Sequence, residues 1–143
     1  MFMKMNSMIN NFSVVIPVFN EEEIFLESAN RIFKICQEMN MPFEIIFSEN
    51  GSLDNTKNLI HDFIEDKDNC FMINSNYANY GLALKNGFEI AKNDVVISFD
   101  IDYFSKKFLK QSLELDENFV ALVASKRLNE SEDERTFIRK MAT

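Results

Sequence analysis

Histidine, cysteine and tryptophan are nearly missing from this sequence of 143 residues, which has one His, two Cys and no Trp. A single histidine, His61, excludes a metal centre built from a histidine cluster. Cys36 and Cys70 are isolated in apolar surroundings, so we expect reduced core residues of a cytoplasmic protein. The 15 Phe residues predict an aromatic-filled core.

Long hydrophobic runs and excess positive charge are missing too. No segment approaches the ~20 consecutive apolar residues that a transmembrane helix needs. Residues 1–11 hold one Lys and no apolar run, so we expect a flexible N-terminus rather than a signal peptide or membrane anchor. The net charge of −8 makes the surface unsuited to nucleic acid. The length predicts one domain, over residues 12–143.

Short apolar runs alternate with helical patterns, which is typical of βα units around a mainly parallel sheet, an α/β fold. The predicted strands are Phe12–Val18, Phe43–Ser48, Cys70–Asn74, Asp94–Phe99 and Phe119–Ala124. The predicted helices are Glu21–Met39, Asn55–Asp66, Leu82–Lys92, Lys106–Leu113 and Asp133–Met141. Asn20 and Glu23 have the spacing of a capping box for the first helix. Asn50-Gly51 predicts a turn that tolerates φ > 0.

The most informative run is Asp94–Asp102, in which an apolar stretch of strand type ends in Asp100 and Asp102. If strand geometry persists to its end, these two carboxylates project to the same side. Carboxylates held that close repel each other unless a cation lies between them, and Mg²⁺ takes such oxygen ligands. The alternative is a solvated strand end with two incidental aspartates.

Four polar segments follow predicted strands: Pro17–Glu23, Ser48–Thr56, Asn79–Gly87 and Asp100–Asp102. The carboxyl ends of parallel strands meet at one edge of a sheet, where open α/β sheets bind their ligands. This edge would offer carboxylates and amides for a base and a ribose, helix N-termini for phosphate, and an aspartate pair for a metal ion.

These segments resemble those of the family-2 glycosyltransferases, of the kind related to polyprenyl- and dolichol-phosphate sugar transferases. The resemblance rests on Val14–Glu22, Glu49–Thr56, Asn79–Gly87, Asp100–Asp102 and Ser125–Arg127, and it runs from about Phe12 to the last residue. It implies a Rossmann-like nucleotide-diphospho-sugar transferase (GT-A) fold and the inverting transfer of a hexose from UDP- or GDP-hexose. The implied acceptor is a polyprenyl phosphate.

The resemblance also implies residue roles. Pro17, Phe19, Glu21 and Glu49 would surround the base and ribose of the nucleotide sugar. Asp100 and Asp102, with Ile101 between them, would hold Mg²⁺ or Mn²⁺ on the pyrophosphate. Arg127 and Arg139 would meet donor or acceptor phosphate, and Asp102 and Arg127 would be the catalytic residues. Three of the four arginines lie in residues 126–143, and arginine suits bidentate phosphate contacts.

The sequence departs from the family pattern at several points. Glu49-Asn50 stands where the pattern has two aspartates, and Phe104 replaces a Gln that acts as a further metal ligand in dolichol-type enzymes. Relatives continue well beyond the length of this chain, so the resemblance predicts a donor-binding part with an incomplete acceptor site.

Two other functional classes stay open. One is a non-catalytic module that binds a nucleotide or nucleotide sugar and works with a partner chain. The other is a flavodoxin- or receiver-like switch domain, which leaves Asp100–Asp102 unexplained. Residues 126–143 combine basic and apolar side chains, so they suit packing on the sheet or contact with a membrane surface. We expect a cytoplasmic location, at the inner face of the membrane if the acceptor is a lipid.

Overall fold

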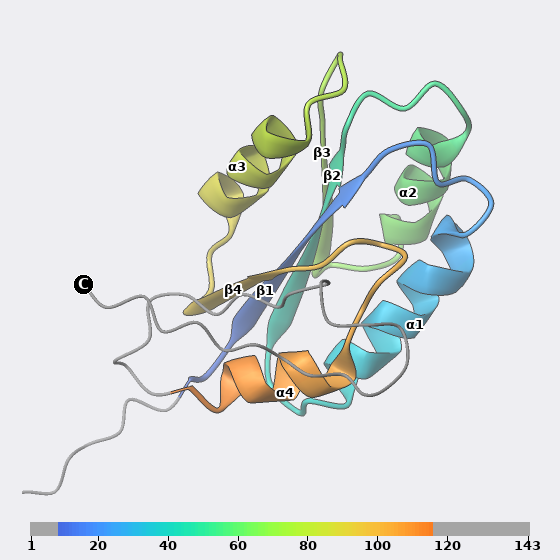
Figure 1. The fold of residues 1–143 in the computed structure, drawn as a ribbon. Helices are drawn as coiled ribbons and strands as arrows, with labels where there is room; N and C mark the ends of the chain where they lie inside the picture. Colours follow the sequence, from blue (N-terminus) through green and yellow to red (C-terminus); the bar gives the residue numbers. More distant parts are fainter. Residues whose placement is uncertain (1–8, 116–143) are drawn as a thin grey trace, which may run out of the picture. The chain divides into compact units, whose positions relative to one another are not determined.

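The computed structural model describes residues 9–115, and its core is a four-stranded parallel sheet (Figure 1). The strands are β1 (Phe12–Val18), β2 (Phe43–Glu49), β3 (Cys70–Asn74) and β4 (Val95–Ser98), in the order β3-β2-β1-β4. The helices are α1 (Phe25–Gln37), α2 (Thr56–Ile64), α3 (Tyr80–Ile90) and α4 (Lys106–Leu113). Residues 10–104 form one compact unit, and α4 belongs to a second unit.

The alternation of strand and helix confirms the predicted α/β class, and four predicted strands lie where expected. β1, β3 and α4 have the predicted bounds, and the others differ by a few residues at their ends. The predicted strand Phe119–Ala124 and helix Asp133–Met141 lie outside the described residues. Within the described part of the chain, no helix is long and apolar enough to cross a membrane.

The helices of the larger unit cover both faces of the sheet, with α1 and α2 on one side and α3 on the other (Figure 1). Every residue of β1 is buried, because this strand is inside the sheet and covered on both faces. Strands in that position read as unbroken apolar runs rather than as alternating patterns. This is why Phe12–Val18 was recognisable in the sequence.

Phenylalanine rings fill the layer between the sheet and the pair α1–α2. Phe63 of α2 meets Phe25 of α1 and Phe47 of β2 edge to face, with ring centroids 6.0 and 5.7 Å apart. Edge-to-face pairs at such distances are favourable beyond the area they bury. The prediction of an aromatic-filled core is confirmed for this layer.

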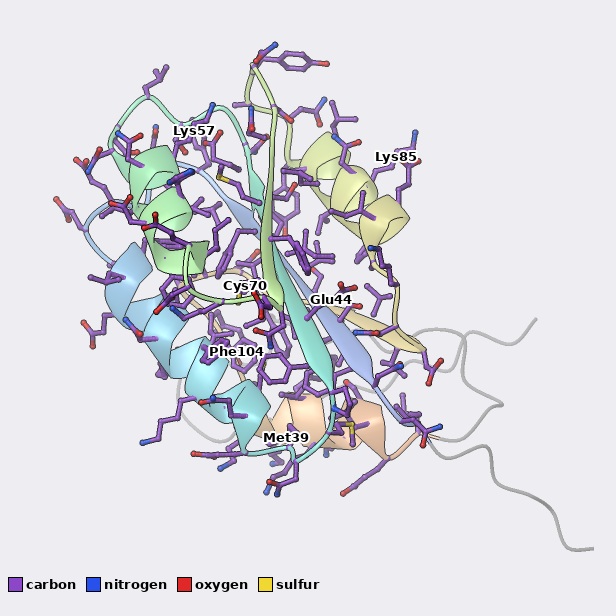
Figure 2. The ribbon with its side chains drawn as sticks, turned by 180° about the vertical axis from the view of Figure 1, so that it is seen from behind. Met39, Glu44, Lys57, Cys70, Lys85 and Phe104 are labelled. Carbon is purple, nitrogen blue, oxygen red and sulfur yellow. The ribbon has the colours of Figure 1, made fainter. Side chains whose placement is uncertain are left out.

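A buried carboxylate ties α3 to the sheet at the end opposite the four polar segments. Glu44 of β2, labelled in Figure 2, accepts hydrogen bonds from Ser13 Oγ at 2.6 Å and from the Lys92 N–H at 2.7 Å. Lys85 lies on the outer side of α3 and points away from the sheet (Figure 2). Hydrogen bonds satisfy Glu44, as a buried carboxylate requires.

The predicted capping box is wrong. Helix α1 begins at Phe25, its N-cap residue is Ile24, and no side chain caps it. Asn20 instead adopts a φ of 51° and accepts a hydrogen bond from the Leu53 N–H at 2.8 Å. The Asn20 side chain, which the local spacing predicted to cap the helix, therefore bonds to the β2–α2 loop instead. The turn predicted at Asn50-Gly51 is confirmed, because Gly51 has a φ of +75°.

Candidate functional site

A cleft of about 240 Å³ opens at the carboxyl ends of the strands, where the four polar segments were expected to meet. Its lining residues are Pro17, Val18, Phe19, Glu21, Asn50, Tyr80, Asp100, Ile101 and Asp102. They come from the end of β1, from the loops after β1, β2 and β4, and from the start of α3. The parallel topology therefore brings all four segments to one cleft.

The aspartate pair reaches the cleft by a turn and not by an extended strand. Strand β4 ends at Ser98, and the Tyr103 N–H donates to the Asp100 carbonyl oxygen at 3.1 Å, which closes a turn over Asp100–Tyr103. The condition that strand geometry persists to Asp102 is therefore not met. Ile101, 1% exposed, anchors the turn in the core while both flanking aspartates line the cleft.

Tyr80, the first residue of α3, contacts the first of the two aspartates. Its Oη donates a hydrogen bond to Asp100 Oδ1 at 2.8 Å. Partial burial and this hydrogen bond to a carboxylate raise the pKa of Tyr80 to about 12. The phenol therefore stays protonated at neutral pH and acts as a donor toward Asp100.

The cleft is strongly acidic. Partial burial raises the pKa of Glu21, and the negative charges of Asp102, Asp54 and Asp100 raise it further. A cation bound at this place would relieve that repulsion, and carboxylate oxygens are hard ligands that suit Mg²⁺ or Mn²⁺. No group of three or more His, Cys, Asp or Glu residues in the described ranges is arranged to hold a metal ion. A metal at the aspartate pair would therefore need ligand oxygens to complete its coordination.

Hydrogen bonds lock the β1–α1 loop, which carries Phe19 and Glu21, to the β2–α2 loop. The Asn20 N–H donates to Ser52 Oγ at 3.0 Å, and the Glu21 N–H donates to Thr56 Oγ1 at 2.8 Å. The return bond from the Leu53 N–H to Asn20 makes the contact reciprocal. These bonds hold the backbone on one side of the cleft in a fixed position.

Asp54 strengthens the same lock. It accepts hydrogen bonds from the Glu22 N–H at 3.2 Å and from the Thr56 N–H at 3.0 Å. Burial acts to raise the pKa of Asp54, but the hydrogen bonds from Thr56 and Glu22 outweigh it and lower the pKa. Asp54 is therefore ionised at neutral pH and acts as an acceptor between the two loops.

Most of the sequence-predicted site residues meet at the cleft. Pro17, Phe19, Glu21, Asp100, Ile101 and Asp102 line it. Glu49 is not among the lining residues: its carboxylate is 2% exposed and accepts hydrogen bonds from the Ser52 N–H at 2.6 Å and the Gly51 N–H at 3.3 Å. Its contact with the ribose stays a prediction. Arg127 and Arg139 lie outside the described residues.

Besides the apolar Val18, sequence reasoning missed two polar members of the site, Asn50 and Tyr80. Asn50 is 5% exposed, and its Oδ1 accepts a hydrogen bond from the Asn79 N–H at 2.7 Å. Asn79 in turn caps α3 by accepting from the Leu82 N–H at 3.0 Å. Both residues lie inside polar segments that the sequence analysis singled out, so their polar side chains in those segments were the available signal.

Comparison with known proteins finds relatives that share one name and come from several bacteria. The chain is similar to the undecaprenyl-phosphate 4-deoxy-4-formamido-L-arabinose transferase of Proteus mirabilis, with 36% identity over 97 residues, 66% of this chain and 29% of that protein. The protein of the same name from Pectobacterium carotovorum is 37% identical over the same shares. That from Pseudomonas fluorescens SBW25 is 39% identical over 93 residues, 63% of this chain and 27% of its own length.

The chain thus spans less than a third of the length of these relatives. The sequence profile described as "Glycosyl transferase family 2" matches residues 13–142, which is nearly the whole chain. The matched residues include every element around the cleft. On this match, the chain belongs to glycosyl transferase family 2.

Proposed function

We propose that this chain binds a nucleotide sugar in the cleft and takes part in the inverting transfer of its glycosyl group to a polyprenyl phosphate. The observation that carries the proposal is the composition of the cleft. It combines an aspartate pair with the apolar residues Pro17, Val18 and Phe19 at the carboxyl ends of parallel strands. Such a place binds nucleotides in open α/β sheets, with the diphosphate at the polar end.

Each end of the cleft takes a different part of the donor. The apolar residues at the end of β1 suit the faces of a nucleobase, and Phe19, which is 41% exposed, offers its ring for stacking. Glu21 accepts hydrogen bonds from ribose hydroxyls. Asp100 and Asp102 would hold Mg²⁺ or Mn²⁺, which when bound neutralises the charge of the leaving diphosphate. Tyr80 holds the Asp100 carboxylate in place through its hydrogen bond.

The acceptor side of the proposal rests on the relatives, whose name specifies undecaprenyl phosphate. A phosphate acceptor already carries an ionised oxygen at neutral pH, so its attack needs little help from a general base. Arg127 and Arg139 are the proposed phosphate contacts, and Arg127 with Asp102 stays the proposed catalytic pair. A lipid acceptor places the reaction at the cytoplasmic face of the membrane. The base, uracil or guanine, stays open.

Calorimetry with UDP and GDP, each with Mn²⁺ and with a chelator, tests donor binding. We expect each nucleotide to bind much more tightly with the metal ion, because the aspartate pair needs phosphate oxygens to complete the coordination of the metal. Asp102→Asn should abolish the metal-dependent part and leave the thermal stability unchanged, since Asp102 is exposed. Asp62→Asn, at a side chain that is 78% exposed on α2, is the matched control. Equal affinity with and without metal would remove the metal role.

A transfer assay separates catalysis from binding. The assay supplies a radiolabelled nucleotide sugar and undecaprenyl phosphate, and it measures label in the lipid phase. Transfer by the purified chain supports the proposed enzyme. Metal-dependent nucleotide binding without transfer or donor hydrolysis would instead identify the alternative, a binding module that works with a partner chain.

A further inference from the structure

Strand β3 lies at one edge of the sheet, between α2 and α3 in Figure 2, and pairs on one side only among the described residues. Its ladder with β2 is visible at both ends. The Ile45 N–H donates to the Asn69 carbonyl at 2.9 Å, and the Ser75 N–H donates to the Glu49 carbonyl at 2.9 Å. Because the backbone groups of successive residues in a strand point to opposite sides, the odd-numbered residues of β3 bond to β2 and the even-numbered ones face outward.

The outward backbone groups of β3 belong to Cys70, Met72 and Asn74. The Cys70 N–H already has an acceptor, the Lys67 carbonyl at 3.2 Å. The other outward groups include the Cys70 carbonyl, the N–H and carbonyl of Met72 and the Asn74 N–H. No described strand lies beyond β3 to bond them. A row of such groups is a template on which another strand can pair.

The usual devices that protect an edge strand are missing from β3. Its five residues include no charged residue and no proline, and its register with β2 is continuous, so the strand has no bulge. Its length is typical of strands in globular proteins. Phe71 is 41% exposed beside this edge. In a chain with a net charge of −8, β3 therefore offers an uncharged, partly apolar edge for pairing.

This edge fits a second copy of itself in the antiparallel direction. With a two-fold axis at Met72, the two Met72 residues form a hydrogen-bonded pair, which exchanges both N–H···O bonds. The Asn74 N–H of each copy then meets the Cys70 carbonyl of the other. Phe71 comes opposite Ile73 of the second copy, and residues two apart project to the same face. Aromatic and β-branched side chains in such cross-strand pairs stabilise a sheet.

The charges at the two ends of β3 favour the same arrangement. Asp66, Lys67 and Asp68 precede the strand, whereas residues 75–79 after it are uncharged. Antiparallel pairing brings the charged end of one copy beside the uncharged end of the other. Like charges directly opposite each other destabilise paired strands, and this direction avoids them.

We propose that β3 is a dimerisation edge, through which the four-stranded sheets of two copies of this chain join into one continuous sheet. The inference is independent of the proposed function, because no residue of β3 lines the cleft. Antiparallel pairing points the carboxyl ends of the two sheets in opposite directions. The two clefts therefore open away from each other, and the affinity for a nucleotide should be the same in monomer and dimer.

Sedimentation velocity over a wide range of protein concentrations tests the dimer. We expect the dimer fraction to rise with concentration. Phe71→Lys should raise the dissociation constant of the dimer by about tenfold or more, because it replaces the contacts with Ile73 by a charge at the edge. Phe88→Lys, at a side chain that is 45% exposed on α3, makes the same change of charge and is the matched control. It should leave the dissociation constant unchanged.

Hydrogen exchange of the wild-type chain locates the interface without any variant. The N–H groups of Met72 and Asn74 gain acceptors in the dimer, whereas those of Phe71 and Ile73 bond to β2 in either state. We expect exchange at Met72 and Asn74 to slow as the protein concentration rises, and exchange at Phe71 and Ile73 to stay the same.

Three results would overturn the inference: a chain that is monomeric at every concentration, an equal effect of the two lysine variants, or a dimer without slower exchange at Met72 and Asn74. Thermal unfolding checks that both variants are folded, and the exchange experiment decides alone if Phe71→Lys is not. None of these results bears on nucleotide binding, which calorimetry measures separately.

Discussion

The packing of α3 on the sheet leads to a sharp prediction about Gly87. This residue is buried on α3 above Val15, which is fully buried at the centre of β1 between Ile46 and Ser98. A Cβ atom at position 87 would lie 2.3 Å from Val15 Cγ1 and 3.4 Å from Cγ2. Carbon atoms prefer separations of about 3.5–4.0 Å, so Gly87→Ala forces a displacement of more than about 1 Å.

The magnitude follows from two opposing effects. Overpacking of a dense core costs about 1–3 kcal/mol, and the stiff χ1 of a β-branched residue prevents Val15 from turning away. Replacing a helical glycine by alanine stabilises the helix by about 1 kcal/mol, because alanine has the higher helix propensity. Gly81→Ala on the same helix is the matched control, because the nearest atom to its new Cβ is Asn79 Oδ1 at 3.7 Å. Gly81→Ala gains propensity without a clash.

Urea unfolding followed by circular dichroism measures the two variants. We expect Gly87→Ala to be less stable than Gly81→Ala by about 1–3 kcal/mol, the cost of overpacking. Val15→Ala should cost less in the Gly87→Ala background than in the wild-type chain, because it removes the clashing methyl groups. Equal stability of the two glycine variants would refute the close approach of α3 to β1.

Three further outcomes are expected. Because the pKa of Glu21 is raised in the folded protein, Glu21 binds a proton more tightly there than in the unfolded chain. Its contribution to stability is therefore full below its pKa of 4.5 in the unfolded chain, and it is lost as the pH rises through its pKa in the folded protein. Glu21→Gln should thus raise the melting temperature at about pH 7 and not at about pH 4. Tyr80→Phe removes the hydrogen bond to Asp100 and should weaken Mn²⁺-dependent nucleotide binding by about 1 kcal/mol, or about fivefold, in calorimetry, and an unchanged Mn²⁺ dependence would contradict that role. Gly51→Ala combines a φ of +75° with a Cβ 2.8 Å from the Tyr77 carbonyl carbon, so it should lower the free energy of unfolding by at least about 1 kcal/mol in a urea titration.

The sheet was predictable because its strands carry their own signal. Strands buried on both faces carry mostly apolar residues, so β1 and β2 stand out in the sequence without any knowledge of their partners. The Rossmann-like GT-A class follows from that alternation together with the family motifs, and the parallel sheet and the family match confirm it. The strand order itself depends on which apolar faces meet, which no local pattern specifies.

The start of α1 was not predictable for a physical reason. The Asn20–Glu23 spacing fits a capping box, but Asn20 bonds to Ser52 and Leu53, more than thirty residues away in the sequence. Tertiary bonding of this kind overrides a local capping preference, which is worth only about 1 kcal/mol. Glu49 illustrates the same limit. The structure shows its carboxylate bound to the Ser52 and Gly51 amides, which the motif did not predict, while its contact with a ligand stays a prediction.

The N-terminus of α3 connects the two ends of the cleft, so the position of this helix matters beyond stability. Asn79 bonds to Asn50, which follows β2, and the neighbouring Tyr80 bonds to Asp100, a proposed metal ligand. Gly87 lies about 10 Å further along the helix axis, outside the cleft. A helix is stiff over this length, so the displacement that Gly87→Ala causes at Val15 reaches both contacts. The small residue at position 87 therefore sets the depth at which the start of α3 meets Asn50 and the proposed metal ligand Asp100.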